Sequence, residues 1–150
     1  MSGGTRNMRF ATAILIMVAT IGSTCSTAAD LGHGGADHNY IPTDLNDCIR
    51  VLDEQVRSED VEKIRTGTIT ASDMHLGLGL RIRNEWGLWG GSRLVVYFRA
   101  LGILHPDDMS GIILQSYVRH VRHEPIRLDE QVSYYKKYWA KSDTSAAQKQ

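Results

Sequence analysis

Apolar residues recur every three or four positions along most of this chain, and this spacing constrains the fold more than any other feature. Two such runs are Leu45, Cys48, Ile49, Leu52, Val56 and Met74, Leu78, Ile82, Trp86. A period near 3.6 places these side chains on one face of a helix. No alternating apolar and polar run is long enough to build a sheet. We therefore predict an all-α fold, a single compact irregular bundle of about five to six helices over residues 42–141.

Capping residues, glycines and prolines divide this region into helices. The expected helices begin at Thr43, Ser58, Ser72, Ser92, His105 and Leu128 and end near Val56, Gly67, Trp86, Gly102, Pro125 and Trp139. Thr43, Ser72 and Ser92 are expected N-caps, because their side-chain oxygens can accept a backbone N–H at a helix start. Pro106 suits a first helical position, and the two acidic residues after it favour the positive end of the helix dipole.

The first 29 residues have the pattern of an export signal. Arg6 and Arg9 precede an apolar run over residues 10–22, and small residues follow up to Ala29. The run is shorter than the ~20 residues of a membrane-spanning helix and within the ~7–15 of a signal peptide. We predict cleavage after Ala28 or Ala29 and a periplasmic or secreted protein. Lipidation of Cys25 and an uncleaved signal are the alternatives, and only these would attach the chain to a membrane.

Two short segments flank the predicted helical domain. Residues 30–41 contain three glycines and no apolar period, which predicts a flexible linker. Residues 142–150 are polar and are predicted to be a disordered tail.

Charge and cysteine content limit the class of protein. The chain has 17 Lys and Arg against 17 Asp and Glu. No basic cluster is evident that would bind phosphates, so nucleic acid is not an expected partner. If Cys25 is removed with the signal peptide, Cys48 is the single cysteine of the mature chain and an internal disulfide is excluded. Because Cys48 lies on an apolar stripe, it is predicted to be a buried small hydrophobic residue rather than a nucleophile.

The middle of the chain concentrates polar side chains that could form one pocket. The candidates are His75, Arg83, Asn84, His105, Asp107, Asp108 and Ser110. In a catalytic interpretation, a histidine beside a carboxylate is a general base and an arginine holds an anionic substrate. In a structural interpretation, the aspartates accept backbone N–H groups at a helix start, and Arg83 pairs with one of them to join two helices. We favour the structural interpretation, since no nucleophile elbow or phosphate-binding loop is present.

Aromatic residues are the candidates for binding. Trp86 and Trp89 are expected in the core, where a tryptophan buries ~150–250 Å², and they are also weak binding candidates. Tyr134, Tyr138 and Trp139 lie with several lysines on the last helix and could form an exposed recognition face.

Histidines could bind a metal ion at two places in the sequence. These sets are His33 with His38, and His120 with His123 and Glu124. No further cysteine or acid clearly completes either set, and zinc needs at least three protein ligands. We therefore predict neither a metal site nor a cofactor.

Two motifs in the middle of the chain resemble a bacterial family of domains of unknown function. The first comprises His75, Gly79, Ile82, Arg83, Asn84, Trp86, Leu88, Trp89, Ser92 and Leu94, and the second is HPDDMS at residues 105–110 with Ile112, Ile113 and Leu114. The resemblance extends over about residues 45–139. It implies one compact helical domain and brings no activity, cofactor or catalytic residue with it.

These observations favour a binding protein over an enzyme. We predict a non-enzymatic interaction domain of the cell envelope, of which an immunity-type protein that neutralises a toxin is one version. Its partner would be a protein or another envelope component. The alternative is an envelope hydrolase that uses His75 or His105 as a base, with Asp107 or Asp108 to orient it.

Overall fold

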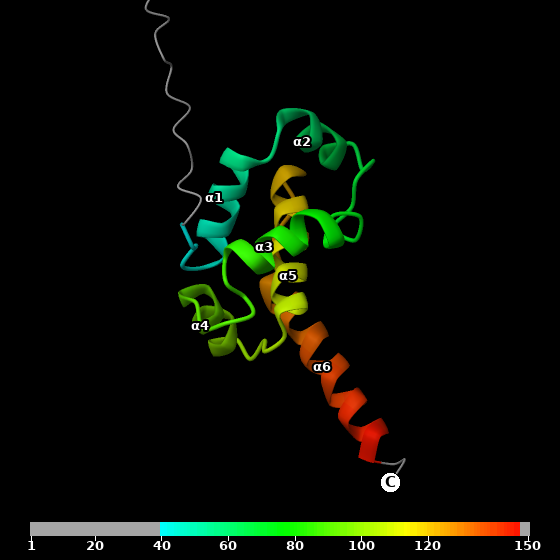
Figure 1. Cartoon of the computed structure of the whole chain (residues 1–150). Coiled ribbons are helices and arrows are strands. Elements are labelled where there is room, and N and C mark those ends of the chain that lie inside the picture. The colour runs from blue at the N-terminus through cyan, green and yellow to red at the C-terminus, as the bar shows by residue number, and fades with distance from the viewer. Residues whose placement is uncertain (1–39, 148–150) are drawn as a thin grey trace, which may run out of the picture. The chain divides into compact units, whose positions relative to one another are not determined.

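The computed structural model (Figure 1) describes residues 40–147, with side chains described up to Ser142. Its helices are α1 (Leu45–Gln55), α2 (Ser58–Arg65), α3 (Leu80–Glu85), α4 (Arg93–Ala100), α5 (Pro106–Val121) and α6 (Leu128–Ala147), with a π-helical segment η1 (His75–Gly79). None of the described residues forms a strand. The predicted all-α fold is confirmed. The predicted signal peptide and most of the predicted linker, with Cys25, His33 and His38, lie outside the described residues.

Helix α5 is the central element of the domain. Helices α1, α2, α3 and α6 and the segment η1 all contact it, and Figure 1 shows α3 crossing in front of it. Most of its residues are buried, among them Met109, Ile112, Ile113, Leu114 and Tyr117. A helix with apolar residues around most of its circumference must be enclosed by other elements. The polar residues at the start of α5 therefore lie beside the helices that enclose α5.

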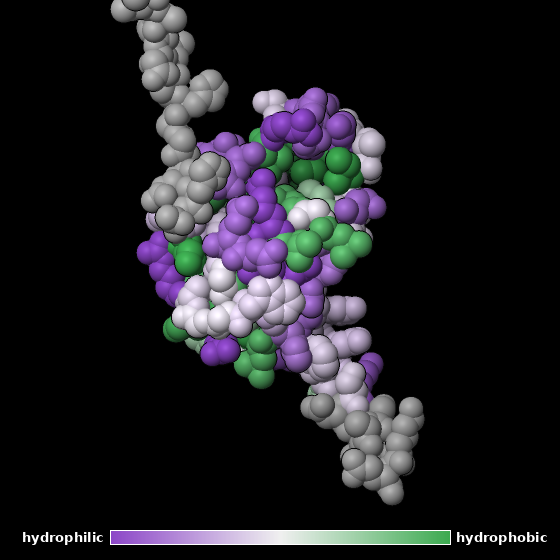
Figure 2. All heavy atoms as spheres, in the orientation of Figure 1, coloured by the Kyte–Doolittle hydropathy of each residue, from purple (hydrophilic) through white to green (hydrophobic). Residues whose placement is uncertain are grey.

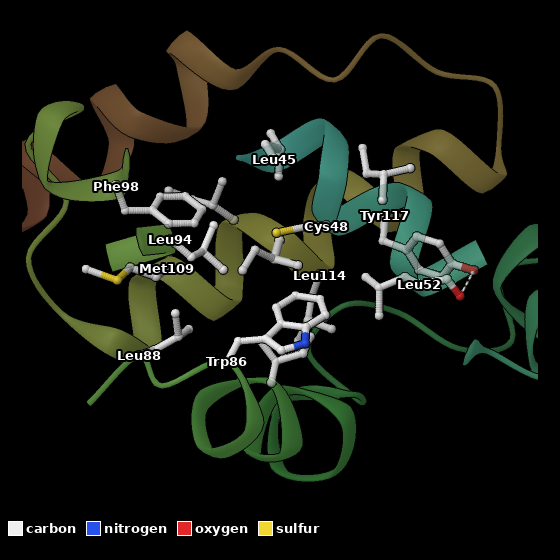
Figure 3. Close-up of a cluster of buried hydrophobic side chains, with 14 of the residues drawn as sticks. Leu45, Cys48, Leu52, Trp86, Leu88, Leu94, Phe98, Met109, Leu114 and Tyr117 are labelled. Carbon is white, nitrogen blue, oxygen red and sulfur yellow. Dashed lines mark hydrogen bonds between the residues drawn. The ribbon is translucent and has the colours of Figure 1, made fainter. Parts of the chain in front are cut away.

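The apolar stripes of α1, α4 and α5 meet in one core (Figure 3). The figure shows the Cys48 side chain directed into this cluster, near Leu94 and Leu114. Cys48 is fully buried, and burial raises the pKa of its thiol well above the usual range, with a smaller contribution from the Asp47 and Asp44 charges. An inaccessible thiol held in its neutral form is not a nucleophile. The prediction that Cys48 is a core residue is confirmed.

Two of the three predicted N-caps differ in the structure. Helix α1 is capped by Asp44, which accepts the Asp47 N–H at 3.0 Å, and not by Thr43 as predicted. Thr43 instead donates its backbone N–H to the Asp47 carboxylate at 2.9 Å. Ser72 does not cap a helix, because a turn separates it from η1. Ser92 is the N-cap of α4 as predicted and accepts the Val95 N–H at 3.4 Å.

The single helix predicted over residues 72–86 is wrong. The chain passes from a turn into η1 and then into α3, which ends at Glu85. Gly77 and Gly79 explain the interruption, because glycine is a poor helix former. The Gly79 N–H reaches back to the Met74 carbonyl at 2.9 Å, which is the longer repeat of a π-helix. A Cβ on Gly79 would lie only 3.1 Å from the Leu114 side chain, so the glycine lets η1 approach α5 closely.

Three helices end in the same left-handed turn. The residue after the cap has a positive φ in each case, namely Gly87 at 63°, Gly102 at 81° and His123 at 57°. The following N–H bonds a carbonyl five residues back, from Leu88 to Arg83, Ile103 to Phe98 and Glu124 to Arg119. This is the Schellman arrangement, and it ends α5 at Val121, before Pro125. The predicted stop at Gly102 is confirmed.

Helix α6 carries two different stripes of side chains. Its inner face (Leu128, Val132, Tyr135 and Trp139) is directed at the domain, and Val132 is buried. Its outer face (Tyr134, Lys137, Tyr138 and Lys141) is exposed throughout. The helix continues to Ala147, past its predicted end at Trp139, and so includes residues of the predicted tail. No helix among residues 40–147 combines the length and apolar character needed to cross a membrane.

Candidate functional site

Arg83 is the centre of a buried polar contact between two helices. Its side chain is buried between α3 and α5, and its Nη1 donates to Ser110 Oγ at 2.8 Å. The same Nη1 lies 3.3 Å from Asp107 Oδ1, and Nη2 donates to the His75 carbonyl at 3.4 Å. A Cβ on Gly79 would stand 3.3 Å from this guanidinium, so the glycine also leaves room for Arg83. The predicted pairing of Arg83 with an aspartate across two helices is confirmed.

His75 and Asp107 lie at the solvent edge of this contact. His75 Nε2 is 3.6 Å from Asp107 Oδ1, which is longer than a hydrogen bond, and both side chains are about half exposed. Asp107 thus faces a buried guanidinium on one side and an imidazole on the other. A general base needs a closer carboxylate partner, although this distance can shorten on ligand binding.

Ser110 has no capacity left for nucleophilic chemistry. It is fully buried, accepts the Arg83 hydrogen bond, and donates its hydroxyl to the Asp107 carbonyl at 2.9 Å.

Asp108 belongs to a separate contact. Asp108 Oδ2 accepts the Trp139 indole N–H at 2.7 Å. The expectation that both aspartates accept backbone N–H groups at the helix start is wrong among the described residues, because side chains of α3 and α6 occupy the carboxylates.

His105 and Asn84 also lie apart from the Arg83 contact. His105 stacks on Trp139, with ring centroids 3.8 Å apart. Asn84 Oδ1 accepts the Trp89 indole N–H at 3.1 Å. The seven predicted polar residues therefore form three contacts rather than one pocket. The first holds α3 to α5, the second holds α6 to α5, and the third holds the loop after α3.

The two tryptophans of the first motif have opposite environments. Trp86 is 2 % exposed and belongs to the core, so it has no surface to offer a partner. Trp89 is 60 % exposed, and its prediction as a core residue is wrong. The left-handed turn at Gly87 separates them, because it reverses the chain after α3 and directs Trp89 outward. Figure 2 shows the hydrophobic side chains of this face as separate green areas with polar groups between them.

A cleft lies between the turn before η1, α5 and α6, and two predicted site residues line it, His75 and Tyr134. We name it the α5–α6 cleft, with a volume of about 600 Å³. Its polar lining includes Ser72, His75, Gln115, Arg119, Glu130 and Tyr134. Gln115 and Arg119 escaped the sequence analysis. Their spacing of four residues places them on one face of a helix, but no pattern in the sequence shows that α6 folds back over that face.

The predicted metal candidates His120, His123 and Glu124 do not assemble into a metal site, and His33 and His38 lie outside the described residues. His120 Nε2 lies 3.0 Å from Asp53 on α1, and His123 occupies the left-handed turn after α5. No group of three or more potential metal ligands is present among the described residues. His120 instead joins α5 to α1 at the surface.

Comparison with known proteins gives a family and no function. A family model described as Domain of unknown function (DUF6794) matches residues 41–121. The match covers α1 to α5 and ends at Val121, so α6 lies beyond it. No curated protein and no solved structure matches the chain. Since the match spans more than half of the sequence and the whole arrangement around Arg83, the chain belongs to the DUF6794 family of domains of unknown function.

Proposed function

We propose that this protein is a non-enzymatic interaction domain of the cell envelope and that it binds a partner protein through the outer face of α6. The observation that carries the proposal is the exposure of this face. Tyr134 is 65 % exposed and Tyr138 is 54 % exposed. With Lys137 and Lys141 they follow the i, i+3, i+4, i+7 spacing by which a helix occupies a groove. Exposed tyrosines are typical of protein interfaces, because one end of the ring is apolar and the other is polar.

The charge of α6 indicates the kind of partner. Lys136, Lys137 and Lys141 follow one another along the helix, and no acidic residue lies between Gln131 and Ser142. A groove with an apolar floor and an acidic rim would complement this face. An immunity-type protein that neutralises a toxin is one version of this function.

A placement in the envelope rests on the first 29 residues. Their apolar run and small-residue tract fit an export signal. Mass spectrometry of the protein from the periplasmic and extracellular fractions should find a chain that begins at Ala29 or Asp30. A full-length chain in the cytoplasm would contradict export.

Site-specific cross-linking tests the α6 interface. A photo-reactive amino acid at position 138 should give a specific adduct in cells, whereas the same group at the exposed Val96 of α4 should not. The partner identified in this way is then purified, and its affinity is measured for the wild-type chain and for Tyr138→Ser and Lys137→Glu. We expect each substitution to weaken binding at least tenfold without lowering the melting temperature. Unchanged affinities, or equal adducts at positions 138 and 96, would refute the proposal.

An envelope hydrolase is the second candidate, and one observation favours it. His75 lines the α5–α6 cleft with Asp107 only 3.6 Å away. His105 also lines a hollow, of about 370 Å³, but its ring is stacked on Trp139 and the neighbouring Asp108 accepts the Trp139 indole N–H, so His75 is the better placed of the two predicted bases. A hydrolase would lose turnover in His75→Asn, while the interaction domain would keep its affinity for the partner in that variant.

A further inference from the structure

The α5–α6 cleft has the size and composition of a small-molecule site. Its volume of about 600 Å³ falls within the ~300–1,000 Å³ of ligand pockets. Leu114, Ala71 and the ring of Tyr135 supply apolar surface, while the polar groups lie on α5 and at the rim. Helix α6 forms one wall, so the cleft exists only where α6 packs on the family domain.

Arg119 carries a positive charge in this cleft that no carboxylate balances. Its Nη1 donates to the Pro125 carbonyl at 3.0 Å, and its Nε is buried without an acceptor. No carboxylate among the described residues lies within 4.0 Å of it, and Glu130, the acid in the lining, pairs with Arg127 at 3.6 Å. A guanidinium presents five N–H donors, and its planar fork matches a carboxylate. Because the buried Nε is out of reach, an anionic ligand would supply the balancing charge and accept from the Nη groups that face the cleft.

Neutral donors stand beside Arg119. Gln115 precedes it by one helical turn, and its amide makes no hydrogen bond to any described residue. Tyr134 lines the same cleft, edge-on to Tyr135 with ring centroids 5.3 Å apart. Gln131 is not available, because its amide donates to Ser116 and to the Ile126 carbonyl. The free donors are therefore a guanidinium and an amide on one helix face, with a tyrosine at the rim.

We propose that the α5–α6 cleft binds a small ligand through a carboxylate group, held by Arg119 and Gln115, with the body of the ligand against Leu114 and Tyr134. A charge-assisted hydrogen bond from arginine is about twice as strong as a neutral one, so the carboxylate dominates recognition. The carboxylate can belong to the end of a peptide or to a sugar acid. The cleft shares Tyr134 with the outer face of α6 but contains neither Tyr138 nor Lys137, so Tyr138→Ser and Lys137→Glu should weaken protein binding and leave ligand binding unchanged.

Paired probes test the proposal on the mature chain. N-acetylalanine is compared with N-acetylalaninamide, and glucuronate with glucose, by NMR titration of the backbone and side-chain amides. We expect at least one acid to shift the Gln115 side-chain amide and to bind roughly tenfold more tightly than its neutral counterpart. The pair that shows this difference identifies the source of the carboxylate. If no acid shifts Gln115, or if acids and neutral probes bind equally, the proposal is overturned.

Variants assign the binding to the cleft. Arg119→Gln should abolish the preference for the acid, while Arg99→Gln, the same change on the exposed end of α4, should preserve it. Because Arg119 also holds the Pro125 carbonyl, Gln115→Glu is tested in parallel, where a repelling charge should weaken acid binding roughly tenfold with no loss of melting temperature. An acid preference that survives in Gln115→Glu would place the ligand elsewhere and overturn the proposal.

Discussion

Arg83 Nη1 donates to Ser110 Oγ at 2.8 Å and lies 3.3 Å from Asp107 Oδ1, so one guanidinium joins α3 to both exposed and buried polar groups of α5. The two ends of the ion pair have different environments. The Arg83 side chain is 4 % exposed and the Asp107 side chain 56 %. The burial falls almost entirely on the arginine, and the contact cannot be treated as a symmetric salt bridge.

Substitutions at the two ends of this pair should have unequal costs. Arg83→Ala removes a buried stem and three polar contacts, and we expect it to destabilise the fold by about 3–4 kcal/mol. Asp107→Asn keeps an oxygen that can accept from Arg83, and solvent reaches this exposed end of the pair, so we expect it to cost only about 1 kcal/mol. Urea unfolding measured by circular dichroism separates these values. If Arg83→Ala were neutral or stabilising, as is common for active-site residues, the catalytic interpretation of this contact would gain support.

Gly111 sets how closely α6 packs on α5. A Cβ at this position would overlap the Tyr135 hydroxyl, so Gly111→Ala should displace α6 and lower stability by about 1–3 kcal/mol despite the better helix propensity of alanine. Tyr135→Phe removes the overlapping oxygen and should restore part of this loss. Gly77→Ala is the matched control, because nothing lies within 4 Å of its added Cβ. A neutral Gly111→Ala in thermal unfolding would show that α6 is not seated closely.

Trp139 anchors α6 through its indole nitrogen. Trp139→Phe keeps a ring to stack on His105 but leaves the Asp108 carboxylate, which is 9 % exposed, without this donor. We expect a loss of about 2 kcal/mol and faster hydrogen exchange along α6. Trp89→Phe makes the same change at a 60 % exposed site and should cost less than about 0.5 kcal/mol. Equal costs for the two substitutions would contradict the anchoring role.

Tyr117 should give the fold an alkaline stability limit. Burial, followed by the nearby Asp53 charge, raises the pKa of Tyr117 to about 12, and its hydroxyl donates to the Leu52 carbonyl at 3.3 Å. A free tyrosine ionises near pH 10, so the unfolded chain loses this proton first and gains stability between about pH 10 and 12. The folded state of the wild type should lose about 1–2 kcal/mol over that interval relative to Tyr117→Phe. Urea unfolding as a function of pH measures this difference, with the exposed Tyr138→Phe expected to follow the wild type.

The residues around Arg83 illustrate how far sequence reasoning reaches. The helix start at Pro106 and the charge of its first turn made an aspartate the natural partner for Arg83, and this pairing is present at 3.3 Å. The choice between Asp107 and Asp108 was not predictable, because neighbouring positions on a helix point about 100° apart and the answer depends on where α3 and α6 cross α5. The same crossing angles separate His105 and Asp108 from the Arg83 contact.

The sequence by itself determined the class of fold, since the spacing of apolar residues and the positions of Gly102 and Pro106 act through local geometry. The burial of Cys48 also followed from its place on one helical stripe. Only the tertiary structure decided the π-helical turn at Gly79, the outward direction of Trp89 and the cleft beneath α6. Each of these depends on which helices pack together and how closely. Close packing brings together residues that are far apart in the chain, and the local spacing of apolar residues does not specify these contacts.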